Sequence, residues 1–340
     1  MRAFARYFFS LLAALLALTV YLPAHYGEPY PRQPGPQFDN AVRSRYTRLL
    51  EENRVEFLLV GDSTLEQDVD PQSLSDALGV PTYPITVVGS KSAFWYLILK
   101  NIVLEAQNRP QYFVLFYRDT MPTLANYHVN GGYIQELDQF ATAHEPFLLE
   151  HAYLNFMNPL EKWAQAYFPL YSSRQRLTEA ADYYTRNLLP GLLLNCRGDC
   201  VERAMAVAHH VDNVREEFRV EALVGDEDLL FTPFAMDFPA RVGDSFLPEI
   251  IRLTRENGIR LILVHVRTLL YPSAQAEPPA LQKYKRDLAA YLKENDVPLL
   301  DFSYDPRLPA DYFYDPVHMN ETGRIAFTQI LAEALKGFLP

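Results

Sequence analysis

The chain has 340 residues, of which 49% are hydrophobic and 13% aromatic, and its formal net charge is -11 at pH 7. This length suits one large domain with an insertion, or two domains, and the hydrophobic content is enough for a sizeable core. The acidic balance argues against a nucleic-acid partner, because phosphate binding needs clustered Lys and Arg. No long run of one charge sign occurs, so the acidity favours solubility.

An apolar N-terminal segment predicts export. Residues 1–24 begin with basic side chains and continue as an uncharged stretch, and a Pro-rich linker follows over residues 25–40. This order is typical of an export signal whose positive end stays in the cytoplasm. The interpretations are an uncleaved signal anchor in the inner membrane, a cleaved peptide and a buried N-terminal helix. Ala24 suits cleavage but Leu22 is large. Both export interpretations place the rest of the chain on the periplasmic or extracytoplasmic face.

We interpret residues 41–340 as one domain. Strands and helices alternate in its first part. The predicted strands cover residues 55–60, 82–88 and 111–117, and the predicted helices cover 40–54, 71–78 and 92–108. Gly79 is expected to end the second of these helices. The alternation indicates a parallel sheet covered on both faces.

The alternation stops at about residue 120 and resumes at about residue 244. Residues 120–243 lack a comparable strand pattern and are rich in helix-forming and aromatic residues. A gap of this length inside a sheet protein must carry structure of its own, so we predict a helical insertion or lid. Its aromatic side chains are interpreted as core residues, with a groove for sugar rings as the alternative.

The last part of the chain again alternates. Helices are predicted over residues 245–258, 281–296 and 320–339, and strands over 259–266 and 297–302, with Asn320 as N-cap of the final helix. The whole pattern predicts a flavodoxin-like, three-layer α/β sandwich with a five-stranded parallel sheet and a helical insertion.

The two cysteines fit an oxidising compartment. Cys196 and Cys200 stand in "NCRGDC", and we predict a disulfide between them, with two free thiols as the alternative. A zinc site is not expected, because there is no second Cys pair and no nearby His. His209, His210 and Asp212 do not predict a metal either, since adjacent histidines on a helix point to different faces. We therefore expect no metal and no cofactor.

Polar residues follow the predicted strands at the edge where an open parallel sheet binds its ligands. Ser63 comes after the first strand, while Asp315 and His318 share a loop before the last helix. Serine is a weak nucleophile at pH 7 unless a base takes its proton, which an imidazole held by a carboxylate can do. We predict these three residues as catalytic; helix capping is the alternative for each.

Three further residues lie at the same edge. The N–H groups of Ser63 and Gly89 are the natural oxyanion donors, although Gly89 is also suited simply to a tight turn. His265, near the end of the fourth strand, is interpreted as a core residue with its hydrogen bonds satisfied. Arg118 follows the third strand and has two interpretations, an oxyanion or anion ligand and a structural ion pair with Asp119.

These residues resemble those of the SGNH/GDSL hydrolase superfamily over roughly residues 54–120 and 244–336. The resemblance rests on Gly61-Asp62-Ser63, on Gly89 and on Asp315-x-x-His318. It implies Ser63 as nucleophile, His318 as base, Asp315 as its orienting acid and Gly89 as an oxyanion donor. The family often has an Asn after the third strand; here the segment is "FYRDTMP" and Arg118 stands nearest.

The export segment together with this departure resembles the membrane-anchored SGNH-like proteins of alginate O-acetylation and of teichoic-acid D-alanylation. That resemblance implies a cell-surface polysaccharide as substrate or acceptor and a polytopic membrane O-acyltransferase as partner. The expected function is an acyl transferase or esterase that works through an acyl-serine intermediate. The alternative is a non-catalytic SGNH-like partner or scaffold subunit of such an acyltransferase.

Overall fold

The computed structural model describes residues 2–27, 30, 40–124, 137, 139–142, 145–154, 158–174, 177 and 230–339. The chain divides into two compact units. Residues 36–152 and 227–340 form the sheet unit, and residues 1–35 and 153–226 form the N-terminal unit.

The sheet unit is built on five parallel strands in the order β2-β1-β3-β4-β5. They are β1 (Phe57–Gly61), β2 (Thr82–Thr86), β3 (Tyr112–Tyr117), β4 (Arg260–His265) and β5 (Leu299–Asp301). The predicted flavodoxin-like sheet is therefore confirmed, with strand ends that differ from the prediction by a few residues. This order is that of a flavodoxin-like α/β sandwich.

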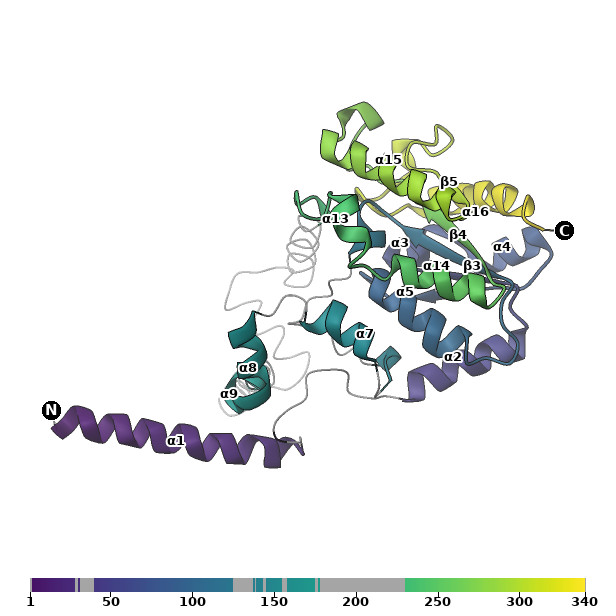
Figure 1. Ribbon diagram of the computed structural model, residues 1–340. Coiled ribbons are helices and arrows are strands. Elements are labelled where there is room, and N and C mark those ends of the chain that lie inside the picture. Colours follow the sequence, from purple (N-terminus) through teal and green to yellow (C-terminus); the bar gives the residue numbers. More distant parts are fainter. Residues whose placement is uncertain are drawn as a thin grey trace, which may run out of the picture. The chain divides into compact units, whose positions relative to one another are not determined.

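Helices cover both faces of the sheet (Figure 1). One face carries α3 (Ser63–Asp68), α4 (Pro71–Leu78) and α16 (Glu321–Lys336), and the other carries α5 (Ser92–Ile98), η1 (Leu99–Val103) and α14 (Leu247–Glu256). All five residues of β1 and all six of β3 are buried. Burial on both sides explains why these strands are continuous apolar runs rather than alternating patterns.

The remaining elements of the sheet unit are α2 (Asn40–Asn53), η2 (Met121–Thr123), α7 (Pro146–Leu148), η3 (Leu149–Leu154), α13 (Phe238–Val242), η4 (Ala274–Ala276), α15 (Pro279–Glu294) and η5 (Ala310–Tyr312). η3 ends within the N-terminal unit. Two predicted helix ends are confirmed. Gly79 caps α4 in the left-handed conformation at φ 72°, and the Asn320 side chain accepts a hydrogen bond from the Gly323 N–H at the start of α16.

The predicted insertion falls partly outside the described residues. Its described parts are helical: η2, α7, η3 and α13, and also α8 (Pro159–Tyr167) and α9 (Pro169–Ser172) of the N-terminal unit. Cys196 and Cys200 lie outside the described residues, as do His209, His210 and Asp212. The disulfide stays a prediction.

The N-terminal segment forms a single helix, α1 (Arg2–Tyr26). Its 22 residues Phe4–His25 are long and apolar enough to cross a membrane, and only 6% of its most apolar window is buried. This is consistent with a signal anchor or a signal peptide. It is not the buried N-terminal helix of the third interpretation.

The last helix approaches the preceding loop so closely that only glycine fits at one position. A Cβ on Gly323 would lie 2.2 Å from the Tyr312 carbonyl oxygen, and that oxygen is held by the Asn320 N–H at 2.8 Å. The helix therefore sets the position of the loop between η5 and α16, which carries His318.

Gly323→Ala is expected to lower the free energy of unfolding by about 1–3 kcal/mol, the usual cost of overpacking. The matched control is Gly337→Ala, because a Cβ there would meet its nearest atom, the Ala334 carbonyl oxygen, at an ordinary 3.5 Å. Urea unfolding of the full chain in detergent measures both. Equal stability of the two variants would contradict the close approach.

Candidate active site

The site begins where β1 ends. A Cβ on Gly61 would lie 2.9 Å from the Phe116 Cβ and 3.0 Å from the Leu65 Cβ, so the strand can end here against β3 and α3 only as glycine. β1 lies between β2 and β3, at the point where the strand order reverses. Ligands of open α/β sheets bind at such a point, at the carboxyl ends of the strands.

Asp62 builds the turn that presents Ser63. Its side chain is 1% exposed and accepts hydrogen bonds from the Thr64 N–H at 3.0 Å and the Thr64 hydroxyl at 2.6 Å. Asp62 is thereby the N-cap of α3, and Ser63 is the first residue of the helix. The hydroxyl bond of Thr64 was not predicted from the sequence.

Ser63, His318 and Asp315 form a continuous chain of hydrogen bonds. The Ser63 Oγ lies 2.9 Å from the His318 Nε2, and the His318 Nδ1 lies 2.8 Å from the Asp315 Oδ2. Because the carboxylate accepts from Nδ1–H, the neutral ring keeps Nε2 free to accept the Ser63 proton. The structure thus brings together three residues that the sequence separates by 255 positions at its widest.

Asp315 is held in its charged form. Partial burial by itself raises its pKa, but hydrogen bonds from the His318 ring and from the N–H groups of Val317 and His318 outweigh burial, and the pKa is lowered. Both N–H groups donate to Oδ1 at 2.7 Å. One carboxylate oxygen therefore orders the loop while the other orients the imidazole.

Asp68 holds the loop that carries His318, and the sequence analysis did not predict this role. Its side chain is fully buried, and its Oδ1 accepts from the Met319 N–H at 2.8 Å. Burial raises its pKa well above the ordinary value, with Asp62 and Asp315 adding to the rise and the Met319 bond opposing it. The sequence around Asp68 carries no signal of this contact, because Met319 lies 251 positions away.

Gly89 lies in the turn after β2. Its φ is 68°, a conformation that favours glycine, which supports the tight-turn interpretation. The same turn is tied to the end of β1, because the Val87 N–H donates to the Gly61 carbonyl at 3.1 Å. Gly89 is thus held at the strand end from which Ser63 follows, and its oxyanion role stays a proposal.

Arg118 is buried between two carboxylates. Its Nε lies 3.7 Å from the Asp62 Oδ2, and its Nη1 lies 4.0 Å from the Asp119 Oδ2. Asp119 was the expected partner; Asp62, the residue before Ser63, was not. Burial raises the pKa of Asp119, while Arg118 draws it down. These contacts support the ion-pair interpretation of Arg118.

His265 is a core residue, as the sequence predicts. Its side chain is 4% exposed, its Nδ1 lies 3.1 Å from the Asp301 Oδ1, and its ring stacks on Tyr117 at 4.8 Å between centroids. It takes no part in the Ser63 hydrogen-bond chain. Among the described residues, no group of three or more His, Cys, Asp or Glu side chains is arranged to hold a metal ion.

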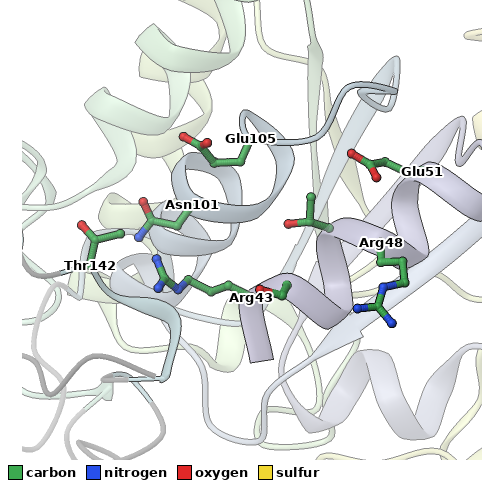
Figure 2. Close-up of a pocket in the computed structure, with 8 residues that line it drawn as sticks. Arg43, Arg48, Glu51, Asn101, Glu105 and Thr142 are labelled. Carbon is green, nitrogen blue, oxygen red and sulfur yellow. The ribbon is translucent and has the colours of Figure 1, made fainter. Parts of the chain in front are cut away.

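A cavity of about 590 Å³ opens elsewhere in the sheet unit. It is lined mainly by α2, and Figure 2 shows Arg43 extending from α2 toward Asn101 of η1. Ser63, Asp315 and His318 are not among its lining residues. The cavity is therefore separate from the candidate active site.

The strand order defines a flavodoxin-like α/β protein, and the hydrogen bonds place a serine, a histidine and an aspartate in line at its strand ends. No family model matches the chain, and no curated protein matches it. Solved structures do. A GDSL-like lipase from Bacteroides thetaiotaomicron matches at 13% identity and TM-score 0.37, over 87% of this chain and 99% of its own. An acetyl xylan esterase matches at 11% identity and TM-score 0.37, over 84% of this chain and 100% of its own. At these values the likeness carries no argument about activity.

Replacing Asp68 by Asn is expected to stabilise the protein at neutral pH. Because the folded pKa is raised, the unfolded chain ionises first as pH rises above the ordinary value of 3.8, and stability is lost across that window. Asn cannot ionise and keeps an oxygen for the Met319 N–H. The gain should grow above about pH 4 and vanish below it.

Urea unfolding of both full chains in the same detergent, between pH 3.5 and 8, checks this. Contributions from groups that do not interact with Asp68 cancel in the difference. A variant that is less stable than the wild type at every pH would contradict the raised pKa.

Proposed function

We propose that this protein is an extracytoplasmic SGNH-type serine enzyme, an O-acyltransferase or carbohydrate esterase acting on a cell-envelope polysaccharide. The observation that carries the proposal is the Ser63–His318–Asp315 chain, with its two hydrogen bonds of 2.9 and 2.8 Å. This geometry matches what a hydroxyl nucleophile needs from a base and an orienting carboxylate.

In the proposed reaction, the Ser63 Oγ attacks the acyl carbonyl while the His318 Nε2 takes its proton. The ester bond then breaks, and His318 returns the proton to the leaving alcohol, which leaves an acyl-Ser63 intermediate. A second hydroxyl, from water or from a sugar, attacks that intermediate and restores Ser63. Asp315 stays ionised throughout and stabilises the imidazolium, in keeping with its lowered pKa.

The negative oxygen formed in each step needs hydrogen-bond donors. We propose the N–H of Ser63, at the first residue of α3, and the N–H of Gly89 for this role. Arg118 is a third candidate, but its ion pairs with Asp62 and Asp119 support a positioning role instead. In that role it neutralises Asp62 and so steadies the turn before Ser63.

One feature supports a sugar as the substrate, and another supports a location at the cell envelope. Tyr314 is 60% exposed and lies parallel to the His318 ring, 5.9 Å away between centroids, so it offers an aromatic face beside the reacting groups. Exposed aromatic rings pack well on the C–H faces of sugars. The apolar N-terminal helix supports placement at the cell envelope. A membrane acyltransferase as partner is proposed on the sequence resemblance alone.

A second candidate function is a non-catalytic partner of that acyltransferase. Arg118 favours it, because this residue stands where the family often has an Asn donor and is engaged with two carboxylates. The intact hydrogen-bond chain from Ser63 to Asp315 favours the enzyme.

The full chain in detergent is expected to hydrolyse a small activated acetyl ester slowly. Ser63→Ala removes the nucleophile and His318→Ala the base, so each should lower turnover by at least about 10²-fold. The double variant should be little worse, because residues that act as one unit are not additive. Asp315→Asn should also be costly, since it favours the wrong tautomer of His318.

Ser73→Ala is the matched control, because Ser73 is an exposed serine on the neighbouring helix α4 and should retain full activity. A folded wild-type chain that is no faster than Ser63→Ala would count against hydrolysis by this chain. The same variants are then scored for acylation of the surface glycan in cells. If cells with Ser63→Ala acylated the glycan as much as wild-type cells, that result would favour the non-catalytic function.

Arg118→Ala separates the two roles of that residue. If Arg118 donates to the oxyanion, turnover should fall about 10²-fold or more with stability unchanged. If it neutralises Asp62 and Asp119, the free energy of unfolding should fall, because two buried carboxylates lose their cation. Thermal unfolding and ester turnover of the same preparation decide between them, and we expect the loss of stability.

A further inference from the structure

Helix α8 of the N-terminal unit exposes an apolar face. Leu160 is 72% exposed, Trp163 56% and Tyr167 48%, and their spacing places all three on one side of the helix. The exposed ring of Phe168 follows directly. We call these four residues the α8 apolar face.

The opposite side of α8 is polar, and side-chain hydrogen bonds cap the start of the helix. Glu161, Lys162 and Gln165 occupy the opposite side, and none of its nine residues, all of them described, is buried. Asn158 and Glu161 form a reciprocal capping box, with both hydrogen bonds at 2.9 Å. This is the pattern of an amphipathic helix whose apolar side is not covered by the described protein.

α8 lies close to the C-terminal end of α1. α9 follows it directly and contacts α1, and the Tyr30 hydroxyl, just beyond α1, donates to the Tyr167 carbonyl at 3.2 Å. Leu22, near the end of α1, is 2% exposed, whereas most of the helix before it is exposed. Among the described residues of α1, the buried one thus lies in the last third of the apolar span.

We propose that the α8 apolar face lies in the outer surface of the membrane that α1 crosses. The basic residues of α1 stand at its N-terminus, so its C-terminal end reaches the outer leaflet. Trp and Tyr are the residues that prefer the boundary between headgroups and acyl chains. A short amphipathic helix beside that end is positioned to lie in the boundary with its apolar face inward.

The α8 apolar face is proposed to contact lipid rather than another protein because of its position near the end of α1. A helix tied through α9 and Tyr30 to the end of a membrane span cannot move far from the bilayer. The inference rests on α1 remaining as the anchor. It is independent of the chemistry at Ser63, so its failure would leave the proposed function untouched.

Intrinsic fluorescence tests this directly, because the chain has two tryptophans. Trp95 is 1% exposed in the core of the sheet unit, and Trp163 lies on the α8 apolar face. The full chain is reconstituted in phosphatidylcholine vesicles with bromine either near the headgroup end of the acyl chains or near the bilayer centre. We expect stronger quenching from the shallow bromine, and loss of that quenching in Trp163→Phe.

A matched pair of variants isolates the helix face. Leu160→Glu puts a charge on the apolar side and should reduce quenching of Trp163 and shift its emission to the red. Gln165→Glu adds the same charge on the polar side, keeps an acceptor for Arg174, and should change neither. The proposal would be overturned if neither brominated lipid quenched Trp163 fluorescence while the intact mass showed that the chain still carried α1. Stronger quenching from the central bromine, or loss of α1 from the mature chain, would overturn it too.

Discussion

The hydrogen bond from the Met319 N–H to the buried carboxyl of Asp68 is the interaction on which the candidate site depends. α3 has six residues, begins at Ser63 and ends at Asp68. One short helix therefore presents the hydroxyl at its first residue and fastens, at its last, the backbone next to His318. The distance between the Ser63 hydroxyl and the His318 imidazole therefore depends on the length of that helix and on the packing of α16 against α3 and η5.

Three carboxylates surround this helix, and each is held differently. Asp315 is ionised through hydrogen bonds from its own loop, whereas burial and the neighbouring charges of Asp62 and Asp315 push Asp68 toward its neutral form. Asp62 caps α3 and lies near Arg118. Asp315 is the one that bonds to the imidazole, and its lowered pKa favours the charged form that a serine–histidine pair needs to stabilise an imidazolium.

Much of this was accessible from the sequence. The strands were predicted because buried parallel strands are unbroken apolar runs, and the loop of Asp315 and His318 because it precedes a helix that Asn320 caps. Asp68 was not, because its importance lies in a contact with a residue 251 positions away. The pairing of Arg118 with Asp62 was missed for the same reason: it crosses from β3 to β1, and nothing local to either segment reports it.

The exposure of the site bears on whether acyl-Ser63 would be hydrolysed or transferred. Ser63 is half-buried, but Tyr314 is 60% exposed and Val88, in the turn of Gly89, is 50% exposed. Among the described residues, an acyl group on Ser63 would thus be open to water as well as to a sugar hydroxyl. Transfer outruns hydrolysis only if the acceptor or a partner covers these residues and excludes water. A transferase would therefore show esterase activity when isolated. It would lose that activity as the acceptor binds, because the bound acceptor would exclude water, the competing nucleophile.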